Sequence, residues 1–113
     1  MIKIAIGSDH AGFELKEQLI AYLKSQSVDV LDKGCYSLER ADYPEAAHEV
    51  AIAVTNKEAI FGILMCGSGN GINMAANKHK GIRSALCWNA EIATLARQHN
   101  DANILALDRK SVV

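Results

Sequence analysis

The chain has 113 residues, with 12 Lys and Arg against 13 Asp and Glu, and a formal net charge of −1 at pH 7. This length suits one domain spanning residues 1–113, and a composition of 50% hydrophobic and 22% charged residues excludes an intrinsically disordered chain. The nearly balanced charge leaves no basic field for nucleic acid or for an anionic membrane.

Targeting and redox signals are weak in this sequence. The longest apolar stretch, residues 59–66, is interrupted by Gly62 and is too short to span a bilayer. Cys35, Cys66 and Cys87 are odd in number and lack the close spacing of a zinc site or a redox motif. We therefore expect a soluble cytoplasmic protein with reduced thiols and no bound metal.

The first half of the chain predicts two strand-helix units. An apolar run over residues 2–7 is typical of a buried strand, and residues 13–25 carry apolar side chains at helical spacing. A second strand is expected over residues 28–31. The polar loop at 32–42 is followed by a helix over about 43–55, where an early proline suits the first turn.

The second half of the chain continues the alternation. Strands are expected at residues 59–65, 82–88 and 104–107, and helices at residues 72–78 and 90–98, with Asn89 as a helix N-cap. Strands joined by right-handed helical crossovers imply an α/β fold with a five-stranded parallel sheet covered on both faces. In such sheets, the loops at the carboxyl ends of the strands carry the chemistry.

Three of these loops hold candidate functional residues. Asp9 and His10 follow the first strand, residues 66–71 follow the third, and Trp88 with Asn89 follows the fourth. Parallel strands end at the same edge, so these loops can converge. Trp88, the single tryptophan, could line a binding site or simply pack in the core.

The glycine loop over residues 67–71 is the richest signal. Glycines at alternate positions let backbone N–H groups point inward and bind an anion, although a tight strand-to-helix turn would need the same glycines. The spacing differs from the dinucleotide fingerprint because Ile72 stands where its third glycine would be, and no Walker A motif occurs.

Cys66 stands directly before this loop. Abstraction of a proton next to a carbonyl needs a base and donors for the negative charge that develops on oxygen. The pKa of a free thiol is about 8.5, and a helix N-terminus lowers it. A thiol beside a ring of backbone donors therefore suggests enolate chemistry.

Several segments together resemble one known family, the type B ribose-5-phosphate isomerases. They are Gly7–Gly12, Asp42–Pro44, Cys66–Gly71, Ala75–Lys78, Gly81–Arg83 and His99–Asn103. Galactose-6-phosphate and allose-6-phosphate isomerases belong to the same superfamily. The resemblance implies a Rossmann-like three-layer α/β/α sandwich with strand order 2-1-3-5-4, a homodimer or homotetramer, and no metal or organic cofactor.

The resemblance also implies roles for the glycine loop. Cys66 is the base that moves a proton between C2 and C1 of an open-chain aldose phosphate, and Ser68 keeps the hydroxyl of the more usual threonine. Gly67, Gly69, Asn70 and Gly71 form the anion hole for the cis-enediolate. Some relatives instead carry a glutamate at the position of Ile72, which leaves Cys66 as the candidate base here.

Other matched positions complete the implied site. His99, with Asp9, is the group that opens the furanose ring, and His10 is a phosphate ligand. Tyr43 and Asn100 line the sugar site, which in this family draws on both subunits.

The carboxyl-terminal end departs from the family pattern. Family members continue past the fifth strand into a helical region that supplies phosphate-binding arginines and packs on the partner subunit. This chain stops at Val113, with Arg109 and Lys110 after the strand. We therefore expect a truncated or frame-shifted version of a longer protein.

The resulting prediction is an aldose-ketose isomerase that interconverts ribose 5-phosphate and ribulose 5-phosphate in the pentose phosphate pathway. Two alternatives stay open: an isomerase of galactose 6-phosphate or allose 6-phosphate, and a noncatalytic sugar-phosphate-binding remnant. Outside the motifs, His48 and His79 are expected to be solvated, Cys35 to be a bystander, and Cys87 to pack in the core.

Overall fold

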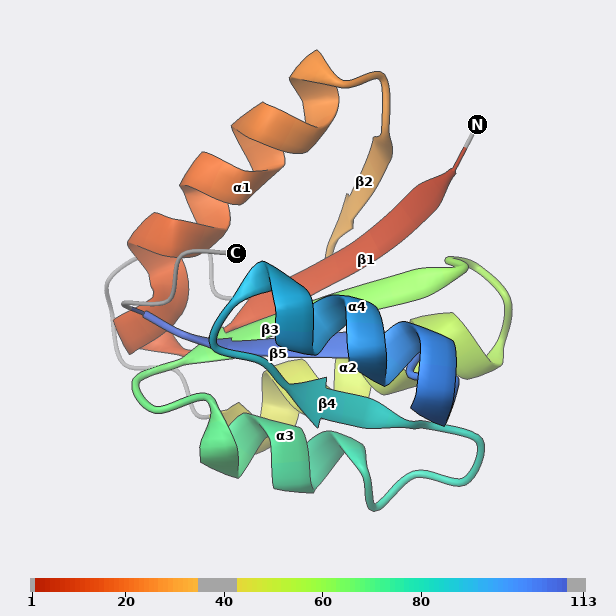
Figure 1. Ribbon diagram of the computed structural model, residues 1–113. Helices are drawn as coiled ribbons and strands as arrows, with labels where there is room; N and C mark the ends of the chain where they lie inside the picture. The colour runs from red at the N-terminus through yellow and green to blue at the C-terminus, as the bar shows by residue number, and fades with distance from the viewer. Residues whose placement is uncertain (1, 35–42, 110–113) are drawn as a thin grey trace.

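The computed structural model describes residues 2–34 and 43–109 of the chain. Within these residues, five parallel strands form one sheet in the order β2-β1-β3-β5-β4 (Figure 1). The strands are β1 (Lys3–Ser8), β2 (Asp29–Asp32), β3 (Phe61–Cys66), β4 (Ser84–Leu86) and β5 (Ile104–Asp108). The helices are α1 (Phe13–Ser25), α2 (Tyr43–Thr55), α3 (Asn70–Ala76) and α4 (Ala90–Asn100), and a short 3-10 helix, η1 (His10–Gly12), precedes α1. The α/β class and the strand order are confirmed.

Helices lie on both faces of the sheet, with α1 and α4 on one face and α2 and α3 on the other (Figure 1). The central strands alternate between these faces, as the two-residue period of a strand requires. On β3, Leu64 packs in the hydrophobic core between the sheet and helices α2 and α3. Ile63 and Met65 pack in the separate core between the sheet and α1.

Close helix packing on the α2 face depends on two glycines in the strands. A Cβ built on Gly62 would lie 2.6 Å from a methyl of Val50, and one built on Gly7 would lie 3.1 Å from that side chain. The absence of side chains at these two positions lets α2 lie directly on β1 and β3. This packing buries Ala47, Val50 and Ala51 completely.

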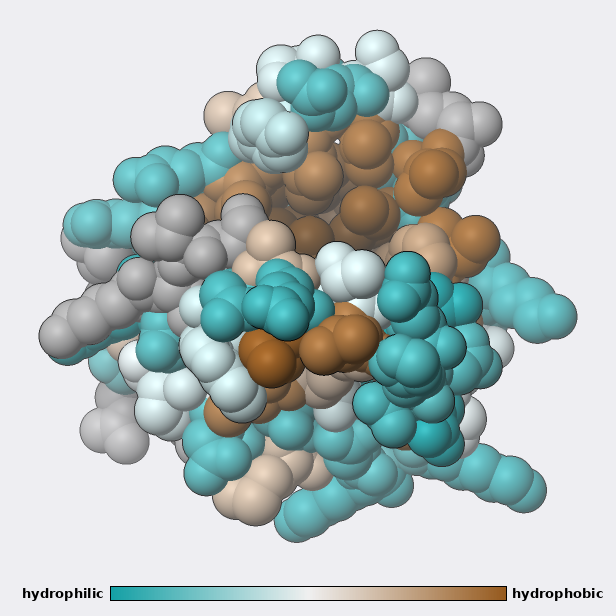
Figure 2. All heavy atoms as spheres, viewed as in Figure 1, coloured by the Kyte–Doolittle hydropathy of each residue, from teal (hydrophilic) through white to brown (hydrophobic). Residues whose placement is uncertain are grey.

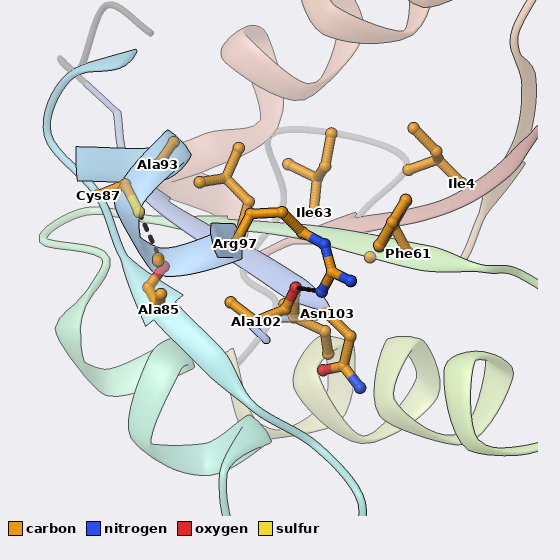
Figure 3. Close-up of a pocket in the computed structure, with 13 residues that line it drawn as sticks. Ile4, Phe61, Ile63, Ala85, Cys87, Ala93, Arg97, Ala102 and Asn103 are labelled. Carbon is orange, nitrogen blue, oxygen red and sulfur yellow. Dashed lines mark hydrogen bonds between the residues drawn. The ribbon is translucent and has the colours of Figure 1, made fainter. Parts of the chain in front are cut away.

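The other face is less completely covered. Figure 2 shows a hollow lined by hydrophobic residues between α1 and α4. Part of it is a cavity of about 230 Å³, whose floor includes Ile4, Ile63 and Leu105 and whose α4 side includes Ala93 and Arg97 (Figure 3). The expectation of a fully covered sheet therefore holds for one face better than for the other.

The bounds of several elements differ from the prediction, and the fourth strand and the third helix are the clearest cases. The fourth strand covers Ser84–Leu86 instead of residues 82–88. It starts late because the N–H of Arg83 donates to the Asn103 side chain, at 2.8 Å, instead of joining the strand ladder. Helix α3 starts at Asn70, two residues early, because Gly69 adopts a left-handed conformation with φ of 77° and serves as its N-cap. The N-cap predicted at Asn89 is confirmed, since its side chain accepts from the N–H of Ile92.

None of the described helices has the length and apolar character needed to cross a membrane.

Candidate active site

The segment after β1 is held against β3 by backbone contacts. The N–H of Asp9 donates to the carbonyl of Met65 at 3.1 Å, and the Asp9 carboxylate accepts from the N–H of Gly12 at 3.0 Å. A Cβ on Gly12 would lie 2.8 Å from the Met65 carbonyl oxygen, so only glycine permits this close approach. Asp9 is consequently 9% exposed and rigidly placed, and His10 beside it is exposed.

Cys66 ends β3 with its thiol turned into the glycine loop. The Sγ atom accepts from the N–H of Gly69 at 3.1 Å, and the residue is 4% exposed. Gly69 reaches this position through its positive φ, and a Cβ there would lie 2.6 Å from a methyl of Leu86. The loop therefore holds the sulfur in place through a backbone donor.

Hydrogen bonds inside the loop narrow the set of donors that remain for a ligand. The Ser68 hydroxyl accepts from the N–H of Asn70 at 3.2 Å, and the N–H of Gly69 is engaged by the sulfur. Across residues 2–34 and 43–109, no hydrogen bond engages the N–H groups of Gly67 and Ser68, and both residues are exposed.

The loops after β1 and β3 lie side by side. A Cβ built on Gly67 would lie 3.8 Å from the Cβ of Ala11, which is ordinary van der Waals contact. The expected convergence of Asp9, His10 and the Cys66 loop at one edge of the sheet is therefore seen in the structure.

Sequence reasoning assigned no role to Asp108, yet this residue adjoins the same site. The strand register pairs Asp108 of β5 directly with Cys66 of β3. The sequence signal for it is a polar residue at the carboxyl end of an apolar strand.

His99 and Asn100 lie at the opposite edge of the sheet. They end α4, and the carbonyl of Asn100 accepts from Nε of Arg83, which directly precedes β4. The amino ends of the strands meet there, whereas Cys66 stands at a carboxyl end. A single chain therefore does not bring His99 beside Asp9 or Cys66.

A polar hollow of about 330 Å³ lies next to Asn100 at this amino edge. Asn77, Arg83 and Ser84 are among its lining residues. Asn77 itself pairs with the backbone of Ser84, through Oδ1 to the N–H and Nδ2 to the carbonyl, both at 2.8 Å.

The remaining candidates have mixed outcomes. Trp88 is 61% exposed, which excludes core packing. Cys87 is buried as expected, and burial raises the pKa of its thiol. His48 is exposed and His79 partly buried, with their ring centroids 5.1 Å apart. Tyr43 begins α2, and Cys35 falls outside the described residues.

Metal-binding side chains do not cluster in the described part of the chain: no three His, Cys, Asp or Glu residues come together there.

Known proteins share both this sequence and this fold. Ribose-5-phosphate isomerase B of Escherichia coli K12 is 51% identical over 112 residues, which are 99% of this chain and 75% of that protein. A putative sugar phosphate isomerase of Rickettsia bellii is 45% identical over 109 residues, which are 96% of this chain and 76% of that protein.

Solved structures agree with these sequence relatives. Ribose-5-phosphate isomerase B of Clostridium thermocellum superposes with a TM-score of 0.96 at 48% identity, covering 98% of this chain and 75% of that one. The ribose 5-phosphate isomerase of Thermotoga maritima superposes with a TM-score of 0.96 at 50% identity, and the match covers 99% of this chain and 77% of that one. The sequence model of one family, described as Ribose/Galactose Isomerase, matches residues 4–113. The chain therefore belongs to the ribose/galactose isomerase family.

Proposed function

We propose that this protein is an aldose-ketose isomerase that interconverts ribose 5-phosphate and ribulose 5-phosphate, within the pentose phosphate pathway of the cytoplasm. The observation that carries the proposal is the position of Cys66, at the end of β3 with its sulfur held by a loop N–H. Its sequence support is the 51% identity to ribose-5-phosphate isomerase B of E. coli.

The proposed chemistry is a proton transfer through a cis-enediolate. The Cys66 thiolate takes the C2 proton of the open-chain aldose and returns it to C1, while a proton passes from the C2 hydroxyl to the C1 oxygen. The N–H groups of Gly67 and Ser68, which carry no other described hydrogen bond, face the charge that develops on these oxygens. Gly69, Asn70 and Gly71 shape the loop around them.

Ring opening requires a second group, and we assign it to His99. In one chain His99 and Cys66 lie at opposite edges of the sheet. We therefore infer a homodimer, or a dimer of dimers, in which one copy supplies Asp9, His10 and Cys66 and the other supplies His99 with Asn100. In this arrangement His10 binds the substrate phosphate, and Tyr43 lines the sugar.

Phosphorylated hexoses are the competing substrates, since the family description includes galactose isomerases. The relatives with the highest identities favour the pentose, because those with a specific name are ribose-5-phosphate isomerases.

The test is to incubate the purified protein with ribose 5-phosphate, galactose 6-phosphate or allose 6-phosphate and to measure each ketose formed. Turnover of the pentose alone is the expected result. Turnover of a hexose phosphate instead would reassign the substrate. Binding of ribose 5-phosphate without turnover would identify a noncatalytic sugar-phosphate-binding protein.

A further inference from the structure

The largest fully buried side chain described in the molecule is that of a lysine. Lys16 of α1 is 0% exposed, and its Nζ donates to both carboxylate oxygens of Asp32, at 2.9 and 2.8 Å. Nζ also approaches Glu17 at 3.2 Å and lies 5.5 Å from the centre of the Phe13 ring. None of the catalytic roles proposed above uses this cation.

The Lys16–Asp32 pair is linked to the candidate site by a short series of hydrogen bonds. Asp32, the last residue of β2, also accepts from the N–H of Gly34 at 3.2 Å. The carbonyl of Gly34 in turn accepts from the N–H of Ser8 at 3.3 Å. Ser8 ends β1 and is followed by Asp9, so this series of hydrogen bonds reaches the segment that carries Asp9 and His10.

An exposed ion pair between β1 and β2 provides a comparison for the Lys16–Asp32 pair. Lys3 and Asp29 bridge β1 and β2 at the amino edge, 3.6 Å apart, with side chains 45% and 49% exposed. Such exposed pairs contribute little because water and salt screen them. The Lys16–Asp32 pair is different: the Lys16 side chain is fully buried, although that of Asp32 is 29% exposed, and a buried ammonium group that loses its partner is left desolvated. The Lys16 contact therefore holds Asp32 in one place.

We propose that Lys16 is a positioning residue for phosphorylated-sugar binding: through Asp32 and Gly34 it holds the carboxyl end of β1 and so sets Asp9 and His10. This inference rests on the proposed function for its substrate. The claim that Lys16 holds the carboxyl end of β1 rests on the hydrogen bonds alone.

The experiment compares Lys16→Met, which removes the charge but keeps much of the side-chain volume, with Lys3→Met as the matched control. Amide hydrogen exchange is measured at Ser8 and Gly12. Iodoacetamide labelling of Cys66 is measured without ligand and with increasing ribose 5-phosphate, together with kcat and KM.

Lys16→Met should accelerate exchange at Ser8 and Gly12 and raise KM, and the concentration that protects Cys66, by about 10- to 100-fold. Labelling of Cys66 without ligand should stay at the wild-type rate, because the β3 loop keeps its own hydrogen bonds. A general loss of structure would instead speed that labelling. Lys3→Met should match the wild type in every measurement.

The double variant Lys16→Met/Asp32→Leu separates positioning from stability. Replacing a buried ion pair by apolar side chains commonly restores stability. It also removes the Asp32 acceptor of the Gly34 N–H, so a raised KM with restored stability supports positioning, even if Lys16→Met alone does not fold.

Wild-type KM in the double variant, or wild-type exchange and KM in Lys16→Met, would overturn the inference. If the unmodified protein turns over none of the sugar phosphates and none protects Cys66, the proposed function fails. Exchange at Ser8 and Gly12 then still decides whether Lys16 holds the end of β1.

Discussion

At the scale of single residues, the thiol at the end of β3 has two attributes that a proton-transfer base needs. Cys66 is almost completely shielded from water, and its sulfur accepts a backbone N–H. The neighbouring Gly67 and Ser68 are exposed, and their N–H groups have no hydrogen-bond partner among the described residues. The proposed base and the proposed oxyanion donors therefore occur together within three consecutive residues.

Cys66→Ser should lower kcat by roughly 100-fold or more, the usual scale for loss of a general base. The hydroxyl preserves the size of the thiol but does not ionise near neutral pH. KM should change little, because the loop backbone is untouched. Steady-state kinetics with ribose 5-phosphate measure both constants, and full activity in this variant would show that the thiol is structural.

Cys87 provides an internal comparison for thiol chemistry. Burial raises the pKa of its thiol, so little thiolate is present near neutral pH. Iodoacetamide should label Cys87 slowly in the folded protein at pH 7.5, and faster as the pH rises beyond 9. Peptide mapping by mass spectrometry would measure this, and substrate should protect Cys66 but not Cys87.

The same shift has a consequence for stability. The folded state holds the Cys87 proton more tightly than the unfolded state does, so this contribution is present below the ordinary thiol pKa and is lost as the pH rises through the raised value. Cys87→Ala should flatten that alkaline loss in urea unfolding curves. An unchanged alkaline slope would contradict this assignment.

At the scale of elements, two asparagines determine where β4 begins. Asn77 pairs with both backbone groups of Ser84, and Asn103 accepts from the N–H of Arg83 and donates to the carbonyl of Gly81. The side chain of Asn77 thus occupies backbone groups of an edge strand that would otherwise be open to another chain. Asn77 and Asn103 both lie in motifs that resemble those of the isomerase family. The hydrogen bonds that their side chains form here hold the start of β4 in place.

Asn77→Ala should therefore lower the free energy of unfolding by about 1 to 2 kcal/mol, the net worth of two partly exposed hydrogen bonds. Urea denaturation followed by circular dichroism would measure the loss. Asn56→Ala, at an exposed position just after α2, is the control and should be close to neutral. Equal stability of Asn77→Ala and the wild type would mean that water replaces both bonds without cost.

At the scale of the whole molecule, the separation of His99 from Cys66 bears on the proposal that the active site is shared between two copies. The two residues stand at opposite edges of one sheet, so the proposed site would combine the carboxyl edge of one copy with the amino edge of another. The arrangement predicts self-association, which sedimentation would detect. A monomer at micromolar concentration with full activity would contradict it.

Mixing two inactive variants tests the shared site directly. Cys66→Ser and His99→Asn should each be nearly inactive toward ribose 5-phosphate. After unfolding and refolding together in equal amounts, random pairing should restore about a quarter of wild-type activity, because one of the two sites in each mixed dimer is intact. No recovery from a mixture that does form mixed dimers would place both residues in the same chain's site.

The sequence was sufficient for features that depend on local pattern. Apolar runs with helical segments between them predicted the parallel sheet, and the shared end of parallel strands predicted that Asp9, His10 and Cys66–Gly71 meet. Element ends were less accurate at β4, because its start depends on Asn77 and Asn103 from other parts of the chain.

Tertiary structure decided the features that depend on distant partners. Lys16 has no sequence signal for burial, since its partner Asp32 lies on another element and the side chain of Lys16 becomes fully buried only in the folded molecule. The loop N–H groups left for a ligand depend on where the Cys66 sulfur and the Ser68 hydroxyl point. The placement of His99 away from Cys66 follows from strand direction, which determines that a helix ends at the amino edge just before its next strand begins. Residue types and their order thus predicted the chemistry, whereas the three-dimensional path of the chain determined which residues can take part in it together.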